Sequence, residues 1–154
     1  MVLFFRNGNQ LEIFMETRLK WAGEAAFIGL TSGGHTVVMD GPPEGGGRNL
    51  GPRPMELLLL SMAACSTYDV VSILKKTRDD IRDCEVTINA SRADEHPKIF
   101  TDIHLKFIIT GKDVKEKNVK RAIDLSAEKY CSASIMLGAM ANITHDYEIR
   151  QVDE

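Results

Sequence analysis

The sequence predicts an α+β fold, and three observations lead to this prediction. Short segments of alternating apolar and polar residues, typical of β-strands, come both before and after one long apolar helix in the sequence. A second helix, amphipathic rather than apolar, follows the later strands. The segments lack the regular alternation of strand, helix and strand that indicates parallel βαβ units. We therefore expect antiparallel sheets wrapped around central helices.

Length and composition are those of a single globular domain. The chain has 154 residues, of which 44% are hydrophobic and 27% are charged. We expect residues 15–154 to form the domain and residues 1–14 to be an N-terminal extension or extra strands. The formal net charge is −3, and no basic run with interleaved aromatic residues occurs, which argues against a nucleic-acid partner.

The cysteine and histidine patterns argue against a disulfide framework and against a zinc site. Three cysteines, an odd number, do not form the disulfide framework of a small secreted protein, so a cytoplasmic protein with reduced thiols is expected. The four histidines lie far apart without the spacing of a zinc site, so no metal is expected. The N-terminus lacks the basic region and cleavage site of a secretory signal.

The N-terminal third of the sequence reads as a series of short strands and one loop. A glycine pair, Gly33-Gly34, supplies a tight turn between two of the strands, and Asn7-Gly8-Asn9 is a turn-prone trio. Residues 41–51 contain five glycines and two prolines and are predicted to be a mobile surface loop. The expected strands are residues 2–5, 11–15, 17–21, 25–30 and 35–40.

The longest predicted element is a helix over residues 52–77. Pro54 suits a first helical position, and Glu56 places a negative charge at the positive end of the helix dipole. The helix is apolar nearly all round, which requires cover from several directions. One small sheet cannot provide that cover, so we expect an obligate, intertwined homodimer. Polar residues after Ala64 interrupt the apolar run, and we expect no membrane span.

One polar stripe runs along this helix. Ser61, Cys65, Asp69 and Ser72 follow helical spacing and fall on one face. A buried cysteine often behaves as a small apolar residue, and serine often bonds to the preceding turn of its own helix. Asp69 is harder to explain in this way, because carboxylates are almost never fully buried without a partner.

The second half of the sequence predicts a hairpin, two helices and a closing strand. Ile81-Arg82 is expected to form a turn, and Asp113 is expected to cap a helix with Glu116 in capping-box position. The expected elements are strands 84–92 and 99–110 joined by loop 93–98, a helix from 113 to about 129, a short helix over 132–140 and a strand over 142–150. Ile103, Leu105, Phe107 and Ile109 are expected to share one face of the second strand.

Two of the three cysteines are candidates for redox chemistry. Cys65 lies in the polar stripe, and Cys131 precedes the short helix, where the dipole favours a thiolate. If the two helices pack together, one thiol can be oxidised by peroxide to a sulfenic acid and the other can condense with it. Cys84 lies between two carboxylates, which raise a thiol pKa, so we expect it to be structural. Lys75 and Lys129 are possible cationic helpers.

Three segments together resemble one known family. PRPMELLLLSMAACSTYDVVSILKK, DLSAEKYCS and NITHDYEI are similar to the OsmC/Ohr family, and within it to the YhfA-like branch. The resemblance implies a homodimer in which two sheets enclose paired central helices. It also implies a thiol-dependent peroxidase for organic hydroperoxides and hydrogen peroxide, with Cys65 as peroxidatic and Cys131 as resolving cysteine. The reductant would be an external dithiol or a lipoylated protein, and no flavin, haem or metal cofactor is implied.

The sequence departs from this family pattern at the position of an activating glutamate. Better-studied members place a Glu ten residues before the peroxidatic cysteine and pair it with an Arg, whereas Met55 stands there in this sequence. Glu56 is displaced by about 100° around the helix. Glu56, Asp69 and Arg53 are therefore candidate supporting residues, and Arg18 and Arg48 are further candidates for the cation. The alternative hypothesis is a non-catalytic OsmC-like protein that binds a small ligand or senses redox state.

Overall fold

The computed structural model describes residues 3–7 and 10–153, and for residues 3–7 and 10–14 it describes the backbone alone. The chain forms two compact units, residues 1–58 and residues 59–154. The long helix begins in the first unit and continues through the second. The turn expected at Asn7-Gly8-Asn9 includes two residues that lie outside the described ranges.

The first unit consists of a hairpin, a three-stranded sheet and a loop. The hairpin pairs β1 (Leu3–Asn7) with β2 (Gln10–Phe14). The sheet contains β3 (Arg18–Trp21), β4 (Phe27–Leu30) and β5 (Thr36–Met39), antiparallel and in that order. This arrangement confirms the predicted meander. Gly34 has a φ of 83°, a conformation that glycine adopts without strain, at the turn between β4 and β5.

A buried carboxylate organises the glycine-rich segment that was expected to be a mobile loop. The side chain of Asp40 is 1% exposed and accepts hydrogen bonds from the backbone N–H groups of Gly41, Arg48 and Leu50, at 2.8, 3.0 and 3.1 Å. The segment includes a short 3₁₀ turn, η1 (Pro43–Gly45). A Cβ at Gly47 would overlap the carbonyl group of Gly41, so this close backbone approach requires glycine. The segment is therefore anchored from within.

Helix α1 (Pro54–Lys76) starts and ends within two residues of the predicted limits. At its start, the Glu56 carboxylate accepts a hydrogen bond from the backbone N–H of Arg53 at 2.9 Å, as in one half of a capping box. At its end, Arg78 adopts a left-handed φ of 62°, and the N–H of Asp79 donates to the carbonyl of Leu74. This is the bonding pattern of a Schellman C-cap.

The second unit is built on a mixed three-stranded sheet in the order β6-β7-β8. β6 (Asp80–Arg92) and β7 (Phe100–Lys112) are antiparallel, whereas β8 (Asn142–Gln151) runs parallel to β7. The α+β class is confirmed, but the expectation of purely antiparallel sheets is wrong for this pair, because intervening helices return the chain to the same end. The predicted turn at Ile81-Arg82 is also wrong, since both residues lie within β6.

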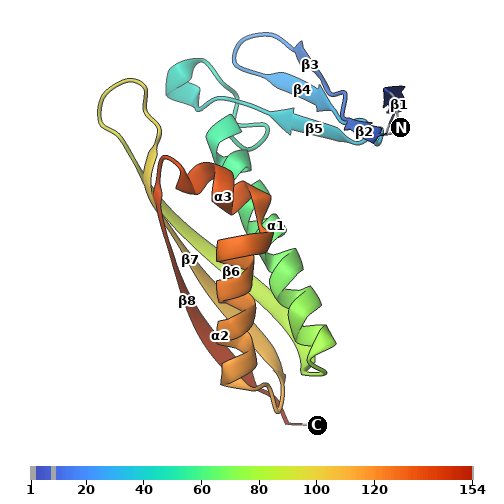
Figure 1. The fold of residues 1–154 in the computed structure, drawn as a ribbon. Coiled ribbons are helices and arrows are strands. Elements are labelled where there is room, and N and C mark those ends of the chain that lie inside the picture. Colours follow the sequence, from blue (N-terminus) through green and yellow to red (C-terminus); the bar gives the residue numbers. More distant parts are fainter. Residues whose placement is uncertain (1–2, 8–9, 154) are drawn as a thin grey trace. The chain divides into compact units, whose positions relative to one another are not determined.

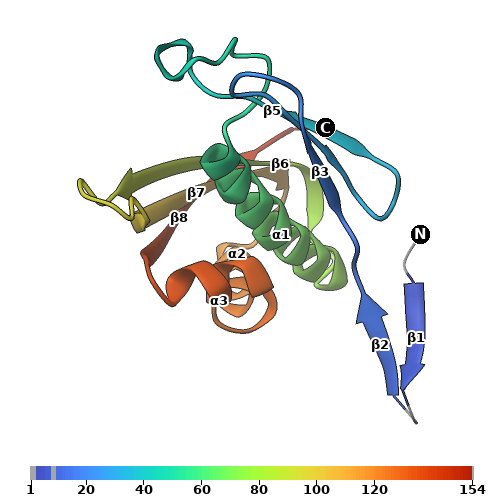
Figure 2. The same cartoon turned by 90° about the horizontal axis from the view of Figure 1, so that it is seen from above.

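The core of the second unit lies between this sheet and the helices. Ile103, Leu105, Phe107 and Ile109 of β7 are at most 1% exposed, which confirms the predicted apolar face. Figures 1 and 2 show α1 and α2 (Glu116–Leu125) side by side across the same face of the sheet. The buried residues of α1 are Met62, Ala63, Ser66, Val70 and Leu74, and those of α2 are Val119, Ala122 and Ile123.

Helix α2 is capped by a residue from another part of the chain. Asp113 has a φ of 52°, which excludes it as the N-cap, and Lys115 takes that position without a side-chain bond. The Asp79 carboxylate instead accepts hydrogen bonds from the Lys115 N–H at 3.1 Å and the Asn118 side chain at 2.7 Å. The predicted capping box is therefore wrong, and the turn after α1 provides the cap.

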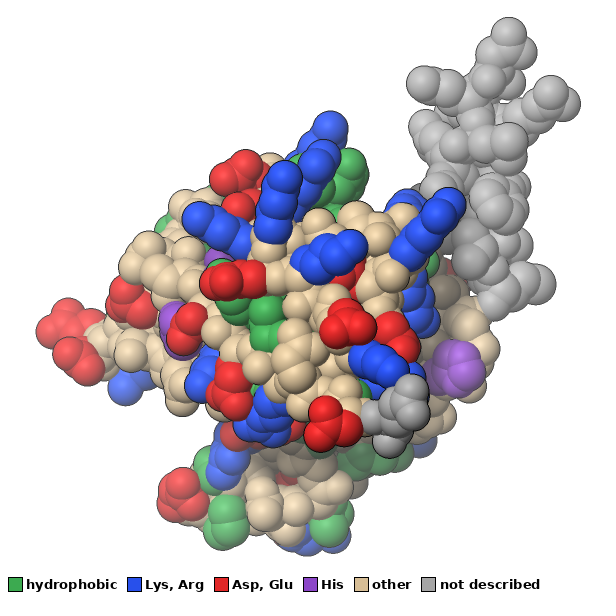
Figure 3. Space-filling model, turned by 90° about the horizontal axis from the view of Figure 1, so that it is seen from below, with side chains coloured by type: hydrophobic (Ala, Val, Ile, Leu, Met, Phe, Trp, Pro, Cys, Tyr) green, Lys and Arg blue, Asp and Glu red, His purple; other side chains and the backbone are tan. Residues whose placement is uncertain are grey.

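The outer face of α1 is exposed in the single chain. Leu60 and Tyr68 are 54% and 74% exposed, and a second subunit was expected to complete the cover of this helix. By length and composition alone, α1 is long and apolar enough to cross a membrane. Its polar residues were expected to exclude a membrane span, and by this test they do not. The core helix of a globular protein passes the same test. Figure 3 shows the protein from below Figure 1, with acidic and basic side chains intermixed over the face in view.

Candidate active site

The first part of the candidate site comes from α1. Cys65 and Asp69 are one helical turn apart and both are partly buried. The fully buried hydroxyl of Ser66 forms a 3.0 Å hydrogen bond with the hydroxyl of Ser126. Ser126 is also 3.2 Å from a carboxylate oxygen of Asp69, to which it can donate. Ser126 thus links Asp69 of the polar stripe to a second segment of the chain.

That second segment is a wide helical turn that follows α2. The turn, η2 (Ser126–Tyr130), is π-helical, and the N–H of Cys131 closes it by bonding to the carbonyl of Ser126 at 2.9 Å. Such turns occur often at functional sites. The prediction of one helix to about Lys129 is therefore wrong in detail, because α2 gives way to the wider turn after Leu125.

Cys131 is the N-cap of α3 (Ser132–Gly138) and is completely buried. Its Sγ accepts hydrogen bonds from the backbone N–H of Ser134 at 3.4 Å and from the Ser134 hydroxyl at 3.1 Å. The thiol lies 3.9 Å from the carbonyl oxygen of Met62 on α1. This confirms the predicted position of Cys131 at the start of the short helix.

The structure brings three of the predicted site residues together. The Sγ atoms of Cys65 and Cys131 and a carboxylate oxygen of Asp69 all lie within 4.8 Å of one another. We refer to these three residues as the thiol cluster. All three cysteines are free thiols in this structure. A disulfide has an S–S length of about 2.0 Å, so a shift of less than about 3 Å would join Cys65 to Cys131.

Burial dominates the electrostatics of Cys131. Removal from water raises the pKa of this thiol, and the neighbouring Cys65 raises it further, although both hydrogen bonds from Ser134 oppose the shift. The helix dipole was expected to favour a thiolate here, but desolvation outweighs that effect. Cys131 is therefore held as a neutral thiol at pH 7.

The other two supporting candidates are paired with each other in the first unit. The Arg53 guanidinium and the Glu56 carboxylate form an ion pair at 2.9 Å, and both side chains are substantially exposed. The pKa of Glu56 is lowered, first by the hydrogen bond from the Arg53 N–H and then by its guanidinium. The Glu56 carboxylate therefore bonds to the backbone at the start of α1 and forms an ion pair with Arg53.

The remaining cationic candidates make contacts of their own. Lys129 lies over the ring of Tyr130, with Nζ 5.6 Å from the ring centroid. Lys75 lines a cavity of about 230 Å³ together with Cys84. Arg48 pairs with Glu24 and Arg18 with Glu16.

Cys84 is set apart from the thiol cluster by its environment. Burial, followed by the charge of Asp83, raises the pKa of this thiol to about 11. The raised pKa agrees with the sequence analysis, but the main cause, burial, was not foreseen. Cys84 is therefore a natural control for experiments on the other two cysteines.

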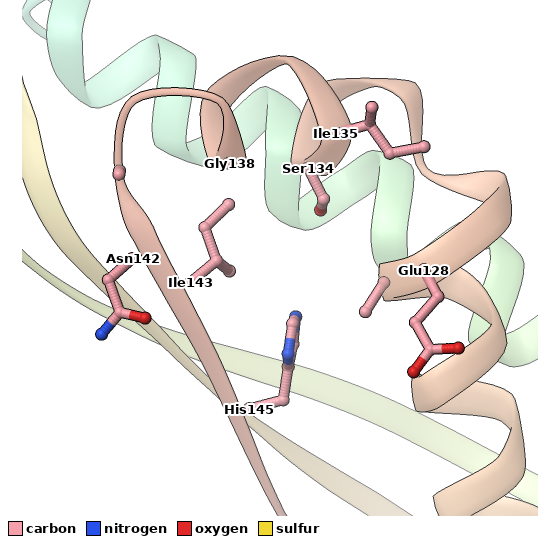
Figure 4. Close-up of a pocket in the computed structure, with 9 residues that line it drawn as sticks. Glu128, Ser134, Ile135, Gly138, Asn142, Ile143 and His145 are labelled. Carbon is pink, nitrogen blue, oxygen red and sulfur yellow. The ribbon is translucent and has the colours of Figure 1, made fainter.

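A larger cavity lies beside α3, and Figure 4 shows its lining residues. It has a volume of about 560 Å³ and is bounded by η2, α3 and β8. His145 points into it from β8, and the imidazole Nε2 is buried without a hydrogen-bond partner among the residues that the structure describes. Burial is the main cause that lowers the pKa of His145, so its ring is neutral at pH 7. Ser134 lines the same cavity and bonds to Cys131.

Sequence reasoning missed Ser66, Ser126, Ser134 and His145. Ser134 had a usable signal, since it stands three residues after an N-cap residue, where its N–H meets the cap. His145 occupies an inward position of the alternating strand, next to Ile143 and Tyr147. The bond between Ser66 and Ser126 joins residues 60 positions apart, and no local pattern reports it.

Comparison with known proteins identifies the family to which this fold belongs. The family model described as OsmC-like protein matches residues 45–146, a range that includes Cys65, Asp69 and Cys131. The chain belongs to the OsmC-like protein family.

Individual relatives extend the match over most of the chain. Protein YhfA of Escherichia coli strain K12 is 47% identical over 135 residues, which cover 88% of this chain and 98% of the relative. A crystal structure of a hypothetical protein from Aquifex aeolicus is 33% identical, with a TM-score of 0.82 over 92% of this chain and all of that one. The similarity confirms the OsmC-like fold expected from the sequence.

A more distant OsmC-like structure carries a functional name. The organic hydroperoxide resistance protein OhrB of Bacillus subtilis is 16% identical, with a TM-score of 0.61 over 88% of this chain and 98% of that chain. At this level of identity the comparison establishes a shared fold alone.

Proposed function

We propose that this OsmC-like protein is a thiol-dependent peroxidase that reduces organic hydroperoxides and hydrogen peroxide in defence against oxidative stress. The observation that carries the proposal is the proximity of Cys65 and Cys131, whose sulfur atoms lie within 4.8 Å. Two free thiols at that separation can complete a cycle of oxidation and disulfide formation. The name of the structural neighbour OhrB, an organic hydroperoxide resistance protein, is consistent with this chemistry.

The proposed cycle has three balanced steps. The Cys65 thiol gives its proton to a base, and the thiolate attacks the terminal peroxide oxygen. The O–O bond breaks, Cys65 becomes a sulfenic acid, and the released alkoxide takes up that proton to leave as an alcohol. The Cys131 sulfur then attacks the Cys65 sulfur, and its proton leaves with the hydroxyl group as water. An external dithiol, free or carried as lipoyl on a protein, reduces the Cys65–Cys131 disulfide and is itself oxidised to a disulfide.

The different environments of the two thiols support their different roles. Cys65 is partly exposed and accessible to a peroxide, whereas Cys131 is completely buried. The raised pKa of Cys131 keeps its proton in place until the sulfenic acid forms. Asp69 places a carboxylate oxygen within 4.8 Å of both sulfurs, and we assign it the role of proton acceptor.

We also propose that the active form is a cytoplasmic homodimer. In the single chain, the sheet β3-β4-β5 exposes Leu19 and Trp21 by 63% and 65%, and α1 exposes Leu60 by 54%. Exposed apolar side chains on both elements are expected where a second subunit covers them. Free thiols suit a reducing compartment.

Peroxide turnover tests this function directly. The reduced protein should consume tert-butyl hydroperoxide catalytically when dithiothreitol is supplied, and peptide mapping should recover a Cys65–Cys131 disulfide after one equivalent of peroxide. Cys84→Ser should do the same, because Cys84 lies outside the thiol cluster. Turnover that survives in Cys65→Ser, or a disulfide that involves Cys84, would contradict the proposal.

A second candidate function is the binding of a small ligand in the cavity beside α3. The unpartnered Nε2 of His145 favours it, because a buried polar atom without a partner is costly and a ligand would satisfy it. The carboxylate of Glu128 at the same cavity disfavours an anion. The expected ligand therefore has an apolar body and an uncharged hydroxyl or amide group.

Benzyl alcohol and toluene are matched probes for this cavity. We expect benzyl alcohol to shift the amide resonances of Ser134 and Ile143 more strongly than toluene, because only the alcohol reaches His145 with a hydroxyl. His145→Leu should abolish the difference between the probes. His104→Leu is the control, since His104 bonds to Thr144 at 2.8 Å and does not line the cavity. Equal shifts from both probes in the wild type would remove this candidate.

A further inference from the structure

The thiol cluster has the composition of a soft-metal site as well as that of a redox pair. Two cysteine sulfurs and a carboxylate oxygen, all within 4.8 Å of one another, are three ligands that Zn²⁺ and Cd²⁺ accept. In a tetrahedral zinc site, bonds of about 2.3 Å to sulfur and about 2.0 Å to oxygen place the ligand atoms about 3.5–3.8 Å apart. A contraction of about 1 Å would bring the cluster to that size.

The scaffold positions these three ligands from rigid elements. Cys65 and Asp69 project from neighbouring turns of α1, and Cys131 is fixed by the N–H bond that closes η2. Ligand atoms in metal sites are usually oriented by an outer layer of hydrogen bonds. That layer is present here, because Ser134 donates twice to the Cys131 sulfur and Ser126 lies 3.2 Å from the Asp69 carboxylate.

The charges of the thiol cluster also favour a cation. Asp69 lies beside two thiols, and the hydrogen bond described for its carboxylate comes from a neutral hydroxyl. If both thiols ionise, three negative charges share a space less than 5 Å across, a cost that a divalent cation would offset. Cys65 and Asp69 are only partly buried, which leaves an approach from solvent and a fourth position for water.

We infer that the reduced protein binds one thiophilic divalent cation, Zn²⁺ or its analogue Cd²⁺, through Cys65, Asp69 and Cys131. Binding releases the two thiol protons to solvent and forms two metal–sulfur bonds and one metal–oxygen bond. Because the same sulfurs form the disulfide, the metal-bound and oxidised states exclude each other. The cation would therefore protect the reduced thiols from peroxide and suppress turnover. The inference requires the thiols to be close together, but it does not require the protein to be a peroxidase.

Titration of the reduced protein with Cd²⁺ tests the site. Thiolate-to-cadmium charge transfer gives an ultraviolet band, which should saturate at one equivalent per chain. Cys65→Ser and Cys131→Ser should each lose at least half of the band, and Cys84→Ser should keep all of it. Asp69→Asn should keep the band but raise the dissociation constant by about tenfold or more. Protein oxidised to the Cys65–Cys131 disulfide should give no band.

The outcomes separate this inference from the proposed function. A full band in Cys65→Ser or Cys131→Ser, or no saturable band in the wild type, would overturn the metal site whatever the peroxide assay gives. Saturation at one equivalent would support the site even in a protein without peroxidase activity. The Asp69→Asn variant retains both cysteines and thus distinguishes loss of a ligand from loss of the fold, which circular dichroism checks in each variant. An unchanged dissociation constant in Asp69→Asn would remove the carboxylate from the proposed ligand set.

Discussion

Replacement of Cys131 by serine should stop the peroxidase cycle after its first step. Cys65 should still react with peroxide, but no neighbouring thiol would remain to displace the hydroxyl group of its sulfenic acid. In the absence of added thiol, Cys131→Ser should consume one equivalent of peroxide and accumulate a sulfenic acid at Cys65. The wild type should instead form the disulfide, because the Cys131 sulfur lies within 4.8 Å of Cys65.

Dimedone labelling followed by mass spectrometry measures this difference. We expect the label on Cys65 in Cys131→Ser, little label in the wild type, and no label at that position in Cys65→Ser. Cys84→Ser should match the wild type, because burial raises the pKa of the Cys84 thiol to about 11 and leaves it unreactive at pH 7. Dimedone on Cys131 in the wild type would reverse the assigned roles of the two cysteines.

Replacement of Asp79 by alanine should lower the free energy of unfolding by about 1–3 kcal/mol, because the partly buried donors at the start of α2 would lose their acceptor. The Asp79 carboxylate joins the turn after α1 to the first turn of α2, through Lys115 and Asn118. Urea unfolding followed by circular dichroism measures the change. Asp80→Ala is the matched control, since Asp80 is exposed and pairs with Arg82 of the same strand. A larger loss in Asp80→Ala would contradict the capping role of Asp79.

The contribution of Asp79 should depend on pH in a defined direction. Burial alone would raise the pKa of this carboxyl, but hydrogen bonds from Thr77, Lys115 and Asn118 outweigh it and lower the pKa below 3.8. A carboxyl with a lower pKa in the folded state stabilises the protein above its unfolded pKa, and this contribution is lost as pH falls through the folded value. The difference in stability between the wild type and Asp79→Asn should therefore narrow below about pH 3.8. A constant difference down to pH 2 would contradict this.

Patterns within a single element were predictable from the sequence, whereas pairings between distant segments were not. The alternating face of β7 and the limits of α1 depend on neighbouring residues, and both predictions are confirmed. The cap of α2 comes from Asp79, 36 residues before the N–H group that it accepts from, so the local signal at Asp113 was misleading. The direction of β8 depends on where the helices return the chain.

At the candidate site, too, local patterns were predictable from the sequence and the effects of packing were not. The stripe on α1 predicted Cys65 and Asp69 as neighbours, and the position of Cys131 before the short helix made it the second redox candidate. The family resemblance then implied the separate roles of the two cysteines. The desolvation that raises the pKa of Cys131 depends on packing, and the dipole argument from the sequence therefore gave the wrong direction. Local spacing also could not reveal that Cys65 and Cys131, 66 residues apart in the sequence, lie close together.

The wide turn η2 makes the thiol cluster sensitive to chain length as well as to the side chain of Ser126, which bonds to Asp69. Its Glu128 and Lys129 side chains are exposed and lie outside the thiol cluster, so substitutions there leave the length of the turn unchanged. Because one residue of an α-helix covers about 100°, loss of one residue between Ser126 and Cys131 would rotate the second sulfur away from α1. An insertion in the surface loop at 93–98 carries no such consequence, because that loop is exposed and lies outside the thiol cluster. Substitutions at the exposed positions of this turn should therefore leave the thiol cluster in place, whereas deletion of one residue should separate its two sulfurs.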